Sequence, residues 1–419
     1  MATRQQTRFV LMVLALAFAS TSLTLLRLGE LPIGVPELVM LGIILLHLPL
    51  GGGIHADVRS SRFAPGLFLL FAATLPGFFV TLTGQGLLPD VMHNLLAMTW
   101  MVVLFTYMQF GFDYRRGELE WLCGLVLVFS CVYFAFCLGL TIVSPDVVFA
   151  AEDFTEFDIA EVRNDDFVAR QRLAGFAANP NQLGLHAIVV LFFCLRYWRS
   201  AGTFKSVLAL ALILVTGALT GSDSFILGAL LMLGTAILFG LMYSGSVYLM
   251  LMLLVPGVVG LVILHRPLLA RLNDFTSAGG QDATRFALWE NGWLAMLERP
   301  LFGWGPGSWS GQTAPFEFSE AHNSVIDYIT YSGLVGAFVM AAGIAAILFG
   351  ALRSRQATLV AGVVGILFFA LFHHTLRQPL MWLSMFYISH HLWAAVPATA
   401  GRRRRSRRGV GRAGGGIPV

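Results

Sequence analysis

Charged residues are scarce in this chain of 419 residues, since Asp, Glu, Lys and Arg together make up only 12% of it. A typical soluble domain carries about twice that fraction. Hydrophobic residues account for 57% of the chain, and the mean hydropathy is +0.75. A water-soluble core cannot hide so much apolar surface, so the composition excludes an ordinary soluble protein and indicates that the bilayer is the solvent.

Cysteine and metal-binding motifs are also scarce. The chain has four cysteines, in or beside apolar runs and at neither disulfide nor metal spacing, which is typical of small packing residues. The polar loops contain no Asp-x-Asp, HExxH or paired CxxC motif, and we interpret the acidic pair Asp165-Asp166 as a solvated face. We therefore expect no catalytic metal and no cofactor.

Long apolar runs, in contrast, are abundant. Each is close to the roughly 20 residues that a helix needs to cross about 30 Å of hydrocarbon, and continuous runs favour helices over barrel strands. The sequence therefore predicts an all-α, polytopic membrane protein with about twelve transmembrane helices. The predicted spans are 9–26, 32–50, 64–84, 90–111, 119–143, 181–198, 204–220, 223–243, 246–264, 324–350, 357–373 and 379–396.

The basic residues predict the orientation. Most of the 27 Lys and Arg fall on one side if the N-terminus is cytoplasmic, as the positive-inside rule requires, and an even number of spans then makes both termini cytoplasmic. The first run has no obvious signal cleavage site and is interpreted as a membrane helix. The arginine-rich tail suits anionic lipid headgroups, and topology explains its charge without a nucleic acid.

Two of the predicted outer loops are long, which is uncommon unless a loop is functional or disordered. The second contains four tryptophans and, at 283–298, an amphipathic pattern that places Phe286, Trp289, Trp293 and Leu297 near one face of an interfacial helix. The predicted organisation is N-terminal transmembrane helices at 1–143, a first periplasmic loop at 144–180, transmembrane helices at 181–264, a large periplasmic loop at 265–322, transmembrane helices at 323–396 and a basic cytoplasmic tail at 397–419.

The first candidate group surrounds Arg172, just ahead of Asn179, Pro180 and Asn181. Asn179 suits a helix cap and Pro180 a first helical turn. An arginine beside a helix N-terminus can bind phosphate, because the free N–H groups also favour an anion. The alternative is a plain headgroup anchor, and residue type alone favours it.

The second group belongs to the large loop. Arg285 precedes Trp289 at the start of the amphipathic pattern, and its planar guanidinium suits phosphate at any working pH. Gly303 and Gly305 in the run GWGPG can let the backbone approach a ligand, or can simply form a turn. For Arg285 a surface anchor is again the alternative.

The third group lies where this loop meets the next span. His322 can exchange protons near neutral pH, although a histidine at an interface can also be an anchor. Asn323 and Asp327 are four residues apart and share a helix face, and Glu320 is close in sequence. A polar cluster at the end of an apolar helix is costly without a function.

Other histidines carry less weight. His373 and His374 lie with Arg377 in a short outer turn and can border the same cavity. His186 lies in a span, where hydrogen-bonded packing is the favoured interpretation.

The segments RLAGFAANPNQLG, TGSDS, TRFALWENGWLAMLERPLFGWGPGSW and AHNSVIDYITYSGLVG, in this order, resemble the O-antigen ligase and O-antigen polymerase superfamily of bacterial polysaccharide assembly. The resemblance implies a membrane glycosyltransferase of GT-C-like architecture in the bacterial inner membrane. Such an enzyme takes a glycan from an undecaprenyl-pyrophosphate carrier on the periplasmic face, without metal or nucleotide sugar. A ligase passes it to lipid A-core, and a polymerase passes it to a second lipid-linked glycan.

The resemblance also implies functional positions. His322 matches the family's loop histidine, Arg285 the arginine ahead of its tryptophan, and Arg172 the arginine ahead of Asn-Pro-Asn; these three are the expected catalytic residues. Many relatives have Ser-Arg where this chain has Ser222-Asp223. Substrate contacts are expected from Asn179, Asn181, Trp289, Gly303, Gly305, Asn323, Asp327 and Arg377.

On this reading His322 accepts the acceptor's hydroxyl proton, the arginines hold the pyrophosphate, and one displacement inverts the anomeric carbon. The main alternative is a transporter or flippase for a lipid-linked glycan, which the composition fits equally well. Transporters usually carry ionisable or broken-helix sites near the midplane. The polar features gather in the outer loops instead, which favours an enzyme over a transporter and over a structural scaffold.

Overall fold

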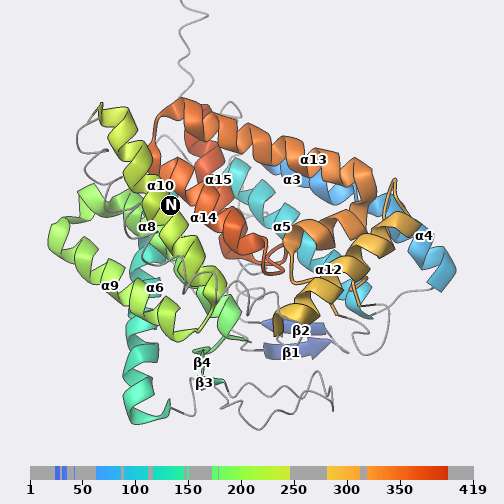
Figure 1. Cartoon of the computed structure of the whole chain (residues 1–419), viewed down its shortest axis with the longest axis horizontal. Helices are drawn as coiled ribbons and strands as arrows, with labels where there is room; N and C mark the ends of the chain where they lie inside the picture. Colours follow the sequence, from blue (N-terminus) through green and yellow to red (C-terminus); the bar gives the residue numbers. More distant parts are fainter. Residues whose placement is uncertain are drawn as a thin grey trace, which may run out of the picture.

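The computed structural model describes part of the chain, and helices dominate that part (Figure 1). The described residues are 24–28, 31–34, 42, 63–85, 89–111, 117–145, 149–150, 172–177, 179–245, 281–311 and 319–394. Among them, 5 helical segments are long and apolar enough to cross a membrane. They are Phe63–Gly84, Asp90–Gln109, Glu118–Val143, Asp223–Ser244 and Ser324–Ser354. The prediction of a polytopic membrane protein is therefore confirmed.

The described residues form helices and a few short strands. The helices are α3 (Phe63–Ala72), α4 (Leu75–Gln85), α5 (Pro89–Gly111), α6 (Glu118–Val143), α8 (Pro180–Ala201), α9 (Thr203–Leu219), α10 (Asp223–Ser244), α12 (Gln281–Glu298), α13 (Ser324–Ser354), α14 (Ala357–Ala370) and α15 (Pro379–Ala394). The strands are β1 (Thr24–Leu28), β2 (Leu31–Gly34), β3 (Phe149–Ala150) and β4 (Arg172–Leu173).

The described residues are mostly helical, as predicted, and two small strand pairs accompany the helices. β1 pairs with β2 and β3 with β4, both antiparallel. β1 and β2 overlap the adjoining ends of the predicted spans 9–26 and 32–50, so those two predictions extended helices too far. The two residues between β1 and β2 are Gly29 and Glu30, and glycine favours short hairpin connections. The rest of both spans, apart from residue 42, lies outside the described residues, as do span 246–264 and the tail 397–419.

Predicted span 64–84 is a single run in the sequence but two helices in the structure. α3 ends at Ala72, and α4 begins at Leu75 after a turn in which the Thr74 hydroxyl donates to the Phe71 carbonyl at 2.8 Å. Pro76 follows at once. Proline lacks an N–H and its ring collides with the carbonyl four residues earlier, so an unbroken helix through this point is disfavoured.

α8 is the central helix of the bundle. It packs against α6, α9, α10, α14 and α15, and nearly every side chain from Leu183 to Cys194 is buried. A helix buried on all sides belongs to the core of a large bundle. It begins as predicted, with Asn179 as its cap: the side chain accepts from the Gln182 N–H at 3.0 Å, and Pro180 occupies the first turn. His186 also behaves as predicted, lying 2.8 Å from the Ser130 hydroxyl.

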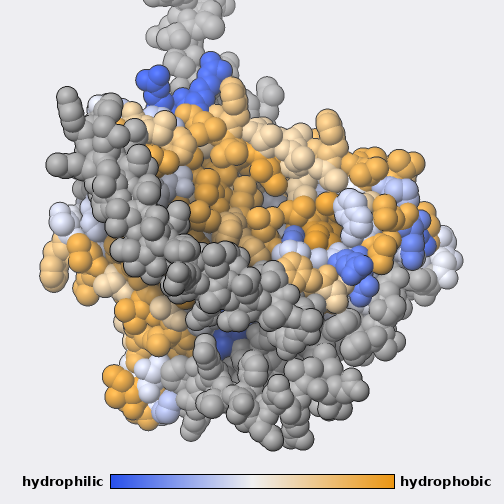
Figure 2. Space-filling view, viewed as in Figure 1, coloured by the Kyte–Doolittle hydropathy of each residue, from blue (hydrophilic) through white to orange (hydrophobic). Residues whose placement is uncertain are grey.

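α10 and α14 pack closely because glycines face each other across the contact. A Cβ on Gly365 would lie 2.8 Å from the Cβ of Met232, and a Cβ on Gly228 would lie 3.3 Å from the Gly365 carbonyl. Small residues let helices approach closely where lipid provides no hydrophobic drive for their association. Figure 2 shows that much of the described surface on this face of the bundle is apolar.

Different segments of the chain meet at the two ends of the bundle. One end, which we call the Glu118 end, joins the start of α6 to the ends of α8 and α15: Tyr197 donates to the Glu120 carbonyl at 2.8 Å, and His391 lies 3.4 Å from the Glu120 carboxylate. The other, which we call the site end, gathers β4, the α9–α10 turn, the start of α13 and the α14–α15 turn. Segments predicted to share one side of the membrane thus lie at one end, while the sidedness itself stays a prediction.

Candidate functional site

α12 forms one wall of the site end, and it covers the stretch 283–298 in which the amphipathic pattern predicted a helix. It packs against α13 (Figure 1), and a Cβ on Gly292 would lie 2.6 Å from both Ile326 and Ser310, so only glycine permits this approach. Leu288 is buried on the same side, while Trp293 is half exposed. The helix therefore turns small and aliphatic residues to the protein and leaves large apolar side chains at the surface.

The run GWGPG, residues 303–307, packs against α13 where that helix is interrupted. Gly333 leaves helical geometry with φ 60° and ψ −158°. The break leaves the Thr330 and Tyr331 carbonyls without donors from α13, and the loop supplies them: the Trp304 N–H donates to the Thr330 carbonyl and the Gly305 N–H to the Tyr331 carbonyl, both at 2.9 Å. These two hydrogen bonds join the loop to α13, the helix that begins just after His322.

Protein backbone lies directly against Gly303 and Gly305. A Cβ on Gly303 would meet the Thr330 carbonyl at 2.4 Å, and one on Gly305 would meet the Phe78 N at 2.4 Å. Both glycines also have positive φ. Close chain packing thus accounts for glycine at both positions, and a substrate contact there stays a prediction.

Gly303→Ala is expected to destabilise the protein by about 1–3 kcal/mol, because the new methyl group meets rigid backbone and the residue must keep a positive φ. The measurement is the midpoint of thermal unfolding in detergent. Gly343→Ala in α13 is the matched control, since a Cβ there has no neighbour within 4 Å. Equal midpoints for the two variants would contradict the packing described.

His322 occupies an unusual backbone conformation. Its φ is 50°, a left-handed value that costs a non-glycine residue about 1–2 kcal/mol. The residues on either side are fixed: the Ala321 N–H donates to Asp327 Oδ1 at 2.8 Å, and Asn323 caps α13 by accepting from the Val325 and Ile326 N–H groups at 3.0 and 3.2 Å. The surrounding contacts hold this conformation. A substrate contact by Asn323 stays a prediction.

The α14–α15 turn lies beside this segment and is bonded to it. The Ser324 hydroxyl donates to the His373 carbonyl at 2.6 Å and lies 2.9 Å from the Thr375 hydroxyl. One residue further on, His374 Nδ1 lies 2.9 Å from Asp327 Oδ2. The sequence placed this turn near the same cavity but gave no sign of these pairings.

Arg377 and Glu320 form an outer ion pair across the same contact. Arg377 Nη2 lies 2.8 Å from Glu320 Oε1 and 2.9 Å from Oε2, and Glu320 Oε2 lies 3.6 Å from His374 Nδ1. Burial raises the pKa of Glu320, but His374 and Arg377 outweigh burial, so the pKa lies below its usual value. The carboxylate therefore stays charged. A substrate contact by Arg377 stays a prediction.

Arg172 is oriented by the start of α8 and the α9–α10 turn. Its Nε donates to the Thr220 carbonyl at 2.7 Å and its Nη2 donates to Asn181 Oδ1 at 2.9 Å. Gly221 makes room for it, since a Cβ there would lie 3.2 Å from the Arg172 Nε. The TGSDS turn thus supports the arginine with a backbone carbonyl, while the Asp223 side chain is exposed at the start of α10.

His373 lies where these elements meet. It is 7% exposed, its ring centroid is 4.5 Å from that of Phe369, and its Nε2 is buried without a hydrogen-bond partner among the described residues. Burial holds the pKa of His373 well below its usual value, and the charges of Arg285, His322 and Arg172 lower it further. The three predicted catalytic residues therefore all act on one buried imidazole.

His322 is an exposed residue, unlike His373, although its surroundings partly desolvate the imidazole. Partial desolvation lowers the pKa of His322; Glu320 and Asp327 oppose this change, and Arg285 and His374 add to it. The net direction favours the neutral imidazole, the form that accepts a proton. Trp289, one turn after Arg285, has its ring 5.9 Å from Phe372 and forms part of the same wall.

Residues 207–341 match the O-antigen ligase domain family. This match supports the resemblance of the chain to the O-antigen ligase and polymerase superfamily. The ligase domain spans α9 to the first half of α13 and contains Arg285, Trp289, His322 and Asp327, whereas Arg172 and Arg377 lie outside the matched residues. Comparison with curated proteins finds no match.

The ligase domain gives the chain a role in the assembly of O-antigen or a related polysaccharide, as a glycosyltransferase-like enzyme in a membrane with lipid-linked glycan substrates. The resemblance seen in the sequence is confirmed at this level. The donor, the acceptor, metal independence, the stereochemistry and the membrane side stay predictions.

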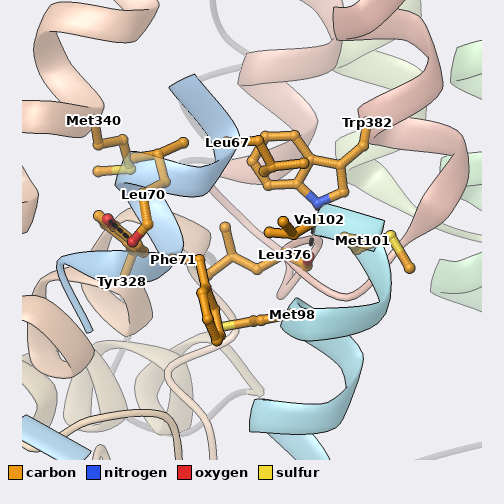
Figure 3. Close-up of a pocket in the computed structure, with 10 residues that line it drawn as sticks. All are labelled: Leu67, Leu70, Phe71, Met98, Met101, Val102, Tyr328, Met340, Leu376 and Trp382. Atoms are coloured by element: carbon orange, nitrogen blue, oxygen red, sulfur yellow. Dashed lines mark hydrogen bonds between the residues drawn. The ribbon is translucent and has the colours of Figure 1, made fainter. Parts of the chain in front are cut away.

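An apolar cavity lies in the bundle (Figure 3), and two of its lining residues, Tyr328 and Leu376, adjoin Asp327 and Arg377 in sequence. Figure 3 shows side chains from α3, α5, α13 and α15 around it, with Leu376 from the α14–α15 turn. The polar atoms in its wall are already bonded: Tyr328 donates to the Leu70 carbonyl and Trp382 Nε1 to the Leu376 carbonyl, both at 2.7 Å. The cavity therefore presents hydrocarbon and sulfur, next in sequence to Arg377.

Proposed function

We propose that this protein is a glycosyltransferase that moves a glycan from an undecaprenyl-pyrophosphate carrier to a sugar hydroxyl. The observation that carries the proposal is the convergence of Arg172, Arg285 and His322 on the buried His373. Binding a diphosphate requires cationic donors, which Arg172 and Arg285 supply from separate elements, and activating a hydroxyl requires a proton acceptor, which His322 supplies.

The two arginines suit the leaving group. Pyrophosphate departs readily, so the enzyme mainly has to bind it and offset its developing charge. Arg172 is already oriented by Asn181 and Thr220, which reduces the reorganisation needed during reaction. Arginine stays charged and can give two parallel hydrogen bonds to phosphate.

His322 suits the acceptor. Its lowered pKa leaves the imidazole neutral near pH 7, so Nδ1 or Nε2 can accept the hydroxyl proton as that oxygen attacks the anomeric carbon. Attack from the face opposite the departing pyrophosphate inverts that carbon in one step. No metal is needed in this scheme, because the cations of the chain neutralise the phosphates.

The apolar cavity supports a polyprenyl carrier. A hydrocarbon chain needs a lining without free polar atoms, and both polar groups in this wall are bonded to the protein. The cavity is too small for a whole polyprenyl chain, so it would hold only a short segment of one, close in sequence to Arg377.

The predicted topology places the site end on the periplasmic face of a bacterial inner membrane, with both termini cytoplasmic. The donor is then a lipid-linked glycan already moved across the membrane. The acceptor is lipid A-core for a ligase or a second carrier-linked glycan for a polymerase.

The test uses purified protein in proteoliposomes with a defined polyprenyl-pyrophosphate glycan and candidate acceptors. We expect a new glycosidic bond and release of polyprenyl pyrophosphate, both detectable by mass spectrometry. Movement of the intact donor across the bilayer without a new bond would support the transporter instead. Adding chelator should leave the rate unchanged if the scheme is correct.

A further inference from the structure

We infer that Asp327 and His374 form a buried dyad that positions His322, and that neither residue contacts the substrate. The inference rests on the proposed function for its kinetic consequences but not for its geometry. It reassigns Asp327, for which the sequence predicted substrate contact.

Both oxygens of Asp327 are already engaged. Oδ1 accepts from the Ala321 N–H at 2.8 Å, and Oδ2 lies 2.9 Å from His374 Nδ1. The residue is 1% exposed. A buried carboxylate is stable only when its charge is paired and its oxygens are bonded, and these partners meet both conditions.

The dyad acts on the residue just before His322. Because Ala321 N–H is fixed by Asp327 and Asn323 caps α13, the peptide groups on either side of His322 have set directions. His322 is then held at φ 50°, a value it would leave if one restraint were lost. The imidazole therefore points where Asp327 and the cap direct it.

His374 transmits the restraint to a different part of the fold. It belongs to the α14–α15 turn, and its side chain is 4% exposed. The Glu320–Arg377 pair closes the same contact from outside. The two pairs fasten residues 320 and 321 to the turn that also carries His373, so the position of His322 is tied to the buried imidazole at the centre of the site.

The dyad also sets the charge around His322. Among the described residues, four charged or titratable groups influence it: Glu320 close in sequence, Asp327 on α13, Arg285 on α12 and His374 on the α14–α15 turn. Asp327 raises the pKa of His322 against burial and Arg285. Removing the negative charge of Asp327 should therefore lower the pKa of His322 further.

Two variants separate charge from geometry. Asp327→Asn keeps an oxygen for the Ala321 N–H and places an amide opposite His374, which can accept after a change of tautomer. Asp327→Ala removes both bonds. We expect Asp327→Asn to move the acid limb of the kcat–pH profile to lower pH with kcat within about tenfold, and Asp327→Ala to lower kcat by about 10²-fold with KM for both substrates little changed.

A parallel pair tests the other partner. His374→Gln retains an N–H that can donate to Asp327, whereas His374→Phe keeps the ring and leaves Oδ2 without a partner. We expect substantial recovery of kcat in the glutamine variant relative to the phenylalanine variant. In a His322→Ala background, Asp327→Asn should have no further effect on kcat, because the dyad acts through His322.

A readout independent of transfer separates this inference from the proposed function. The pH dependence of carbethoxylation of His322 by diethyl pyrocarbonate, followed by peptide mass spectrometry, reports its neutral fraction even if no glycan moves. We expect a lower midpoint in Asp327→Asn than in the natural protein. An unchanged midpoint, or a raised KM with unchanged kcat in Asp327→Ala, overturns the dyad; absent transfer with a shifted midpoint overturns only the proposed function.

Discussion

His322→Ala is expected to lower kcat for glycan transfer by about 10²–10⁴-fold, the usual contribution of a general base. His322 is an exposed residue at the site end and its pKa is lowered, so an acceptor can reach the residue and its imidazole is neutral near pH 7. Alanine leaves the acceptor hydroxyl without a proton acceptor. The measurement is single-turnover transfer in proteoliposomes with saturating donor and acceptor.

A graded set of variants sharpens the result. His322→Gln preserves hydrogen bonding to the acceptor without basicity, so its kcat should stay close to that of alanine if proton acceptance matters, and close to that of the natural protein if His322 only orients the acceptor. His391→Ala at the Glu118 end is the control for loss of a histidine, and we expect it to retain near-normal turnover. Near-normal turnover in His322→Ala itself would remove His322 from the mechanism.

The helices could be predicted from the sequence because hydrocarbon imposes one simple demand. Apolar runs of sufficient length must become helices, since the bilayer offers no other partner for backbone N–H and C=O groups. Apart from 9–26 and 32–50, whose described ends form β1 and β2, the predicted spans that fall on described residues are therefore helical, and Asn179-Pro180 marks the start of α8 correctly. Local chemistry was enough for these features.

The interruptions were harder to predict. α3 and α4 separate at a turn before Pro76, and α13 breaks at Gly333, yet both stretches remain continuously apolar. The break in α13 depends on the GWGPG loop supplying N–H donors from another part of the chain. Because this pairing is a tertiary contact, the hydropathy of the sequence does not reveal the break.

The site was predictable as a set of residue types and unpredictable as a network. Arg172, Arg285 and His322 stand out because cations and histidine at the ends of apolar runs need an explanation. The partners of Asp327 could not be recognised in the sequence, because His374 is 47 residues away and the bond exists only after the α14–α15 turn folds against α13. The importance of His373 has the same origin: its signal was two adjacent histidines after an apolar run, which fits several structures.

Arg285→Ala and Arg172→Ala are each expected to lower kcat/KM by about 10²–10³-fold, the usual cost of removing one preorganised contact to developing charge. Arg172 donates through two of its nitrogens to Thr220 and Asn181, so its orientation depends on the guanidinium shape as well as its charge. Lysine keeps the positive charge but cannot give the two parallel hydrogen bonds of a guanidinium group. We therefore expect Arg172→Lys to recover only part of the activity.

The decisive measurement compares two inhibitors that differ by one phosphate. If the arginines hold a diphosphate, polyprenyl pyrophosphate should inhibit the natural protein more strongly than polyprenyl monophosphate, and this preference should shrink in Arg285→Ala and Arg172→Ala. Arg353→Ala, an exposed arginine at the Glu118 end, is the matched control and should keep the full preference. A uniform loss of activity in which the preference survives would show that the arginines support the fold, and the anion site would then have to lie elsewhere.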